Sequence, residues 1–163
     1  MSEKQRFLDA WNKESALTLK VLRAYPVAQA GLKPHERSRT AKDLAWNFVF
    51  EGYGGAQAAV GELKFPPPGM PPKPEHFDAV VAECDRAFGS LADKVRRADE
   101  AFLNTTVKVA TGPKQTGDSR RIDFLWFLLM DMVHHRGQFT IYLRMAGGKV
   151  PSIYGPSGDE PWS

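Results

Sequence analysis

A disulfide within the chain and a membrane-spanning segment are both excluded by what this chain has little of. Cys84 is the only cysteine among the 163 residues, so no disulfide can form within the chain. The longest uninterrupted apolar run extends from Phe124 to Met130, far short of the roughly 20 residues that a transmembrane helix needs. The first ten residues are polar and lack the apolar segment of a signal peptide. We therefore predict a cytoplasmic protein with a reduced thiol and no membrane partner.

An excess of charge of one sign is also missing, which argues against binding to nucleic acid. The formal net charge is only +3, and the charged residues, 25% of the chain, are scattered along it. The densest basic groups are short, and they comprise Lys94, Arg96, Arg97, Arg120 and Arg121. A nucleic-acid interface would need a basic stripe or a platform of interleaved aromatic residues. We therefore expect no nucleic-acid partner.

Apolar residues at helical spacing predict four helices, over the ranges 4–25, 40–63, 75–102 and 119–145. Thr40 and Asp43 resemble a capping box at the start of the second helix. Three glycines between positions 52 and 55 weaken this helix, so we expect either a kink or a close helix contact near Tyr53. The fourth helix is apolar nearly all round from 124 to 133, which predicts that it is the most buried.

The connections between these helices are mostly long and have distinct compositions. Residues 65–74 include six prolines and predict an extended loop of polyproline type. Residues 105–118 begin with a short alternating stretch, predicting a strand or extended segment, and continue as a polar loop. The tail, 149–162, is rich in proline and glycine but keeps apolar residues that should pack on the body. We predict an all-α fold: one four-helix bundle domain over residues 1–163 with an ordered C-terminal tail.

Asp131 and His135 are the residues most suggestive of chemistry. They lie four residues apart in an apolar helix, and therefore one above the other on the same face. Two polar groups in a dry interior are costly unless they are paired. Either a bound metal ion or an internal hydrogen bond could pair them, and the two residues alone do not choose between these alternatives.

The stretch that surrounds this pair resembles a known family. Residues 128–157, LLMDMVHHRGQFTIYLRMAGGKVPSIYGPS, resemble the last helix and tail of the DinB/YfiT-like superfamily of small four-helix metalloproteins. Residues 32–50, LKPHERSRTAKDLAWNFVF, resemble the entry to that family's second helix. The resemblance covers essentially the whole chain. It implies a divalent metal, commonly zinc or nickel, held by three histidines. A set of histidine and carboxylate ligands would also suit manganese or iron.

Only one of those three histidines is present here. His135 matches the last ligand, directly before Arg-Gly-Gln, whereas Asp131 and Asn47 occupy the other two positions. Aspartate can replace histidine as a ligand, but the neutral amide of asparagine is a poor one. Glu51 follows Asn47 by four residues and could supply a carboxylate from the same helix face, while His134 could turn in from the adjacent face. The resulting candidate metal site consists of Asp131, His135, Glu51 and Asn47.

Two functions follow from this ligand set. The resemblance implies a metal-dependent transferase or isomerase that acts on a small molecule with a low-molecular-weight thiol such as glutathione, mycothiol or bacillithiol. The alternative is a non-catalytic, metal-free protein, stress-related or ligand-binding, in which Asn47, Asp131 and His135 form a hydrogen-bonded cluster. The resemblance implies a homodimer in both cases.

Overall fold

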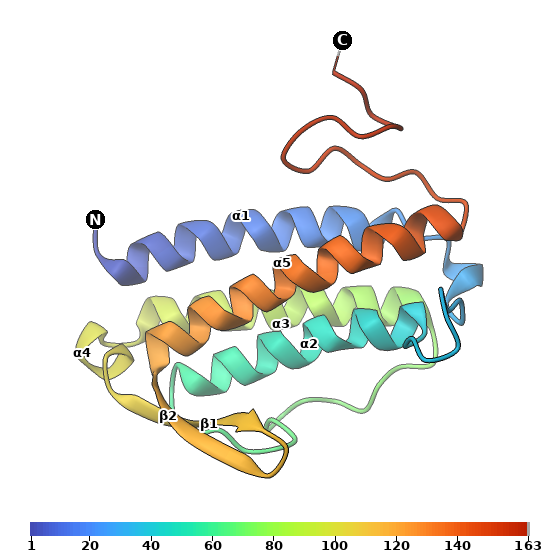
Figure 1. Ribbon diagram of the computed structural model, residues 1–163. Coiled ribbons are helices and arrows are strands. Elements are labelled where there is room, and N and C mark those ends of the chain that lie inside the picture. Colours follow the sequence, from blue (N-terminus) through green and yellow to red (C-terminus); the bar gives the residue numbers. More distant parts are fainter. Residues whose placement is uncertain (163) are drawn as a thin grey trace.

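The computed structural model describes residues 1–162 and consists mainly of helices. Figure 1 shows its four long helices lying side by side. These are α1 (Glu3–Arg23), α2 (Ala41–Ala58), α3 (Phe77–Arg97) and α5 (Arg121–Met145). The shorter elements are the 3-10 helix η1 (Val27–Gln29), helix α4 (Glu100–Leu103) and strands β1 (Thr106–Gly112) and β2 (Gln115–Arg120). Among the described residues, no helix is both long and apolar enough to cross a membrane.

The helix ends follow local hydrogen-bonding rules. The Thr40 hydroxyl accepts a hydrogen bond from the Asp43 backbone N–H at 3.0 Å, so α2 begins where the capping residues predict. At the other end of the chain, α5 ends at Met145 and is followed by Gly147, whose φ of +80° is the left-handed conformation that suits glycine. The predicted start of α2 and end of α5 are both confirmed.

Helix α2 runs unbroken through its glycines and packs closely on α3. A Cβ added at Gly52 would lie 2.7 Å from the Cβ of Ala87, and one added at Gly55 would lie 2.4 Å from Cδ1 of Leu91. Of the two alternatives drawn from these glycines, the structure therefore contains the close helix contact. The predicted continuation of this helix to residue 63 is wrong, because the carbonyls of Ala58 and Gly61 accept hydrogen bonds from the buried Arg121 guanidinium instead.

A two-stranded sheet adds to the mainly helical fold, and β1 confirms the strand or extended segment predicted from residue 105. Strands β1 and β2 pair antiparallel, with Thr106 opposite Arg120. The polar loop and the helix start predicted between 111 and 120 are therefore wrong, and α5 begins only at Arg121. The third helix also ends early, at Arg97, because the Asp99 side chain accepts from a backbone N–H and begins the separate helix α4. The hairpin is difficult to predict because β2 is polar and almost fully solvated.

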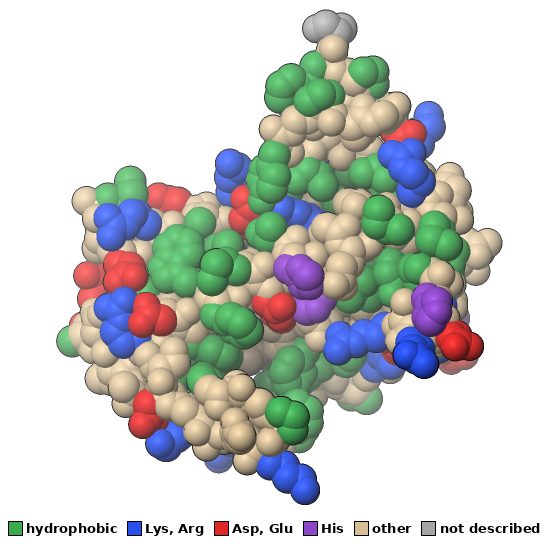
Figure 2. All heavy atoms as spheres, viewed as in Figure 1, with side chains coloured by type: hydrophobic (Ala, Val, Ile, Leu, Met, Phe, Trp, Pro, Cys, Tyr) green, Lys and Arg blue, Asp and Glu red, His purple; other side chains and the backbone are tan. Residues whose placement is uncertain are grey.

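The prediction that the fourth helix is the most buried is wrong. Helix α5 packs against α1 and α2 through one face, and its outer face stays open. Four large apolar side chains on it are more than half exposed: Phe127, Met130, Ile141 and Met145. Figure 2, in the same view as Figure 1, shows hydrophobic side chains gathered in patches along this side of the molecule. Apolar composition all round a helix thus does not imply burial all round.

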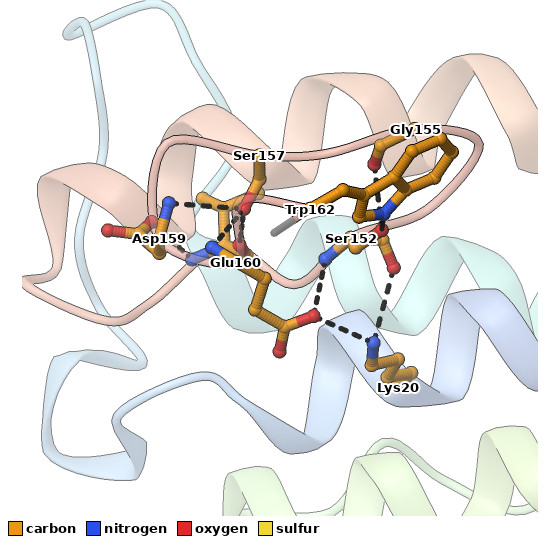
Figure 3. A network of polar contacts seen from close by, with 8 residues as sticks. Lys20, Ser152, Gly155, Ser157, Asp159, Glu160 and Trp162 are labelled. Carbon is orange, nitrogen blue, oxygen red and sulfur yellow. Dashed lines mark hydrogen bonds and ion pairs between the residues drawn. The ribbon is translucent and has the colours of Figure 1, made fainter.

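The C-terminal tail is held against α1 by polar contacts, which are drawn in Figure 3. The Lys20 ammonium lies 3.1 Å from Oε2 of Glu160 and donates to the carbonyl of Ser152 at 3.2 Å. The same Glu160 oxygen accepts from the Ser152 backbone N–H at 2.8 Å. The Trp162 indole donates to the Ser152 hydroxyl at 3.2 Å. The tail is attached to the body as predicted, but the expected apolar packing is found only in part: Ile153 packs against the core, whereas Tyr154 and Trp162 are 60% and 67% exposed.

Arg136 joins three distant parts of the chain in the interior. Its guanidinium is 2% exposed and lies 2.7 Å from Oε2 of Glu14 in α1. It also donates to the hydroxyl of Tyr154 in the tail at 2.5 Å, and that hydroxyl donates to the same Glu14 oxygen at 2.5 Å. The arginine of the His-Arg-Gly-Gln stretch therefore fastens α5 to α1 and to the tail.

Candidate metal centre

Glu51, Asp131 and His135 meet between α2 and α5 and could together hold a metal ion. One ligand atom from each of the three side chains lies within 4.8 Å of the other two. Nδ1 of His135 is 2.9 Å from Oε1 of Glu51 and 3.6 Å from Oδ2 of Asp131. Glu51 is buried, whereas His135 and Asp131 are partly exposed. The cluster is therefore closed on the α2 side and open to solvent beside Asp131.

The local geometry of the two helices produces this arrangement. Asp131 and His135 are four residues apart on α5, and Asn47 and Glu51 are four residues apart on α2. The two side chains of each pair therefore extend from the same face of their helix. Because α2 and α5 pack against each other, the two faces meet. The four residues proposed from the sequence do lie together.

Burial changes the protonation of the cluster. Desolvation raises the pKa of Glu51 from 4.5 to about 7, although the hydrogen bond with His135 acts in the opposite direction. The same hydrogen bond is the main cause of a raised pKa at His135. Near neutral pH, this pair therefore holds protons that free side chains of the same kinds would have released. A metal ion would have to displace those protons in order to bind.

One oxygen of Glu51 has no partner. Oε1 accepts from the Asn47 amide at 2.6 Å and contacts His135 Nδ1 at 2.9 Å. Within residues 1–162, the buried Oε2 makes no hydrogen bond. A buried carboxylate oxygen without a partner is costly and rare in native proteins. It is an atom to which a cation could bind without breaking an existing contact.

Asn47 presents its donor side to the cluster. Its Nδ2 donates to Oε1 of Glu51 and lies 3.1 Å from Nδ1 of His135. Its Oδ1 accepts instead from the Arg39 guanidinium at 3.1 Å, on the side away from the cluster. The amide thus orients Glu51, and its own oxygen is already engaged. Sequence reasoning missed Arg39, which precedes the capping residue of α2 and carries no motif that marks it.

His134 does not join the group. It is exposed, and its Nε2 lies 2.9 Å from the Gln138 side-chain nitrogen on the same helix. The alternative in which His134 turns inward is therefore not the arrangement found. Neither Gln138 nor Arg136 contacts Glu51 or Asp131 in the structure.

A pocket of about 460 Å³ opens beside the cluster. Asn47, Glu51 and Asp131 form one part of its wall, and the hairpin and the segment that follows α2 form much of the rest. Most of this wall is apolar. Figure 1 shows the hairpin beside α2 and the start of α5. The candidate site residues were expected to lie in a cavity between the second and fourth predicted helices, and the pocket lies there. The part that the hairpin plays in its wall was not predicted, because the composition of residues 111–118 indicates a polar loop.

Comparisons with known proteins agree with this architecture. The sequence profile of the DinB family matches residues 1–162. The uncharacterised protein YrdA of Bacillus subtilis is 28% identical over 170 residues, covering 94% of this chain and 89% of YrdA.

Two crystal structures show the same fold. The DinB-like protein YjoA of Bacillus subtilis has a TM-score of 0.74 at 14% identity, covering 91% of this chain and 97% of YjoA. A DinB-like protein of Bacillus cereus has a TM-score of 0.71 at 21% identity, covering 91% of this chain and 95% of its own. The profile match, which extends over nearly the whole chain, establishes the relationship: this protein belongs to the DinB family.

Proposed function

We propose that the protein binds one divalent metal ion through Glu51, Asp131 and His135. The unpartnered, buried Oε2 of Glu51 is the observation that carries this proposal, because it lies in a group whose ligand atoms already converge. One imidazole and two carboxylates suit zinc, manganese or iron. The family resemblance adds nickel. Three protein ligands would leave positions open toward the pocket, as catalytic metal sites do.

We further propose that the pocket serves a transferase or isomerase reaction between a small molecule and a low-molecular-weight thiol. A bound cation would lower the pKa of a thiol or water molecule that binds to it. The chain's own residues would prepare the site: Asn47, held by Arg39, fixes Glu51, and the apolar pocket wall would contact the bound substrate. The resemblance to thiol-dependent relatives is the support for the thiol itself.

A metal-free ligand-binding protein is the second candidate. The contacts among Asn47, Glu51 and His135 favour it, because they satisfy most of the cluster without any ion. The Asn47→His, Asp131→His double variant separates the two candidates. A strong gain in metal affinity over the native protein would indicate that the native group does not function as a metal site. Equal affinity would indicate a change of ligand set only.

Elemental analysis tests the metal proposal directly. Tag-free protein is purified without chelator, supplemented with zinc, nickel, manganese or iron, and compared with His135→Ala. The matched control is His134→Ala, which removes a neighbouring exposed histidine outside the group. We expect about one equivalent of metal in the native protein and the control, and a loss in His135→Ala. Native protein without metal, or full retention in His135→Ala, would contradict the proposal.

We also propose that the protein is a homodimer. The support comes from the outer face of α5, where Phe127, Met130, Ile141 and Met145 are more than half exposed. Sedimentation equilibrium decides the matter, with Ile141→Glu as the variant expected to weaken the dimer. A native protein that sediments as a monomer would refute this proposal.

A further inference from the structure

Gly54 leaves a space that the other glycines of α2 do not. A Cβ added at Gly52 or Gly55 would collide with α3, so those two glycines serve helix packing. Gly54 is also buried, yet a Cβ added there would meet no atom within 4 Å. Gly54 lines the 460 Å³ pocket beside the candidate metal centre. The missing side chain therefore gives the pocket part of its depth.

The pocket wall is rich in aromatic rings. Phe50 of α2 and Phe65 of the following loop lie 5.3 Å apart, centroid to centroid, and Phe124 and Phe127 of α5 lie 6.2 Å apart. All four line the pocket. Phe65 is 85% exposed and Phe127 is 53% exposed, so much of their apolar surface faces solvent. A ring-bearing ligand would cover part of this surface and gain the corresponding free energy of burial.

The charged residues of the pocket wall fall into two groups, one acidic and one basic. Glu51 and Asp131 belong to the candidate metal centre, where a cation would offset them. The other charged residues of the wall are Lys64 and Lys108. Lys108 pairs with Asp118 at 2.8 Å, whereas Lys64 forms no ion pair within residues 1–162. With the cation bound, the pocket would therefore carry an excess of positive charge.

We propose that this pocket binds a compact molecule with an aromatic, apolar body and one carboxylate group. The volume of about 460 Å³ lies in the range of small-molecule sites. The rings of α2, α5 and the 65–74 loop would contact the body, and the positive charge would select the carboxylate. Molecules of this kind would be the substrate class of the proposed metal site, and the charge preference rests on that proposed function.

Calorimetric titration with naphthoate tests the inference, with neutral naphthylmethanol and cationic naphthylmethylamine as matched probes. Gly54→Leu fills the pocket from α2, and Gly54→Ala is a milder step that should fold at least as well as native protein. Gly89→Leu is the control, because Gly89 is an exposed glycine of another helix, α3, that also has open space around an added Cβ. Metal content is measured on each sample.

We expect naphthoate to bind native protein with one-to-one stoichiometry and more tightly than either other probe. Gly54→Leu should weaken binding at least about tenfold, and Gly89→Leu should leave it unchanged. Lys64→Met should reduce the preference for naphthoate over naphthylmethanol roughly two- to fivefold.

Two outcomes would overturn the inference: naphthoate binding that is absent or insensitive to Gly54→Leu, or tighter binding of the alcohol or the amine. The metal content tests the proposed function separately. Protein that contains no metal yet binds naphthoate in the Gly54-dependent way would sink the metal proposal and support the ligand class. Protein that contains metal, but whose naphthoate binding does not depend on Gly54, would support the metal proposal and overturn the proposed ligand class.

Discussion

Replacing Glu51 with glutamine should make the metal-free protein more stable at alkaline pH. Burial raises the pKa of Glu51 from 4.5 to about 7, so the folded protein binds this proton more tightly than the unfolded chain does. The associated stability is complete below the unfolded pKa and is lost as the pH rises through the folded pKa. The raised pKa of His135 acts in the same direction, and its main cause is the hydrogen bond with Glu51.

The size of the effect follows from the shift. A displacement of about 2.5 pKa units, at 1.36 kcal/mol per unit, corresponds to ~3 kcal/mol between about pH 4 and pH 8. Glutamine keeps an oxygen that can accept from Asn47 and face His135, but its buried amide nitrogen takes the place of the unpartnered Oε2. We therefore expect a net gain of about 1–3 kcal/mol for Glu51→Gln at about pH 8, and little difference at about pH 5.

Urea unfolding in the presence of chelator, followed by far-ultraviolet circular dichroism over this pH range, measures the effect. The free energy of unfolding of native protein should fall with rising pH, and that of Glu51→Gln should fall much less. Parallel pH profiles, or a variant less stable than native protein at about pH 8, would refute the reasoning. Saturating metal should reverse the order, because only the native carboxylate can bind the ion.

Three further predictions concern packing, the buried ion pair and metal affinity. Gly52→Ala should lower the free energy of unfolding by roughly 1–3 kcal/mol, because its Cβ would collide with α3. Gly54→Ala should raise it by up to about 1 kcal/mol, because the added Cβ meets open space. Urea unfolding compares the two variants, and equal effects would contradict the packing argument. Arg136→Met should cost about 3–5 kcal/mol by leaving Glu14 buried without its partner, and adding Glu14→Gln should recover part of the loss in the same assay. Metal affinity of native protein is measured by competition with a chromophoric chelator. It should fall by roughly ten- to a hundredfold per pH unit below about pH 7, because the ion must displace protons from Glu51 and His135. A flat profile would argue against these two residues as ligands.

Local patterns in the sequence were enough to predict most of the helices. The Thr40 cap and the glycines after Met145 set helix ends through hydrogen bonds and backbone angles that involve only near neighbours. The apolar stripe of the third helix, from Phe77 to Val95, is buried as its spacing indicates. The polar strand β2 was missed because its pairing partner, and not its own composition, makes it a strand.

The candidate site was predicted in part, because part of it depends only on spacing along a single helix. The four-residue spacings of Asn47 with Glu51 and of Asp131 with His135 place each pair on one helix face, and the sequence alone determines those spacings. Only the tertiary structure decided that the two faces meet, that Arg39 turns the Asn47 amide, and that the hairpin closes a pocket beside them. Helical periodicity comes from hydrogen bonds four residues apart, whereas these contacts join segments far apart in the chain and form only when the whole core is packed.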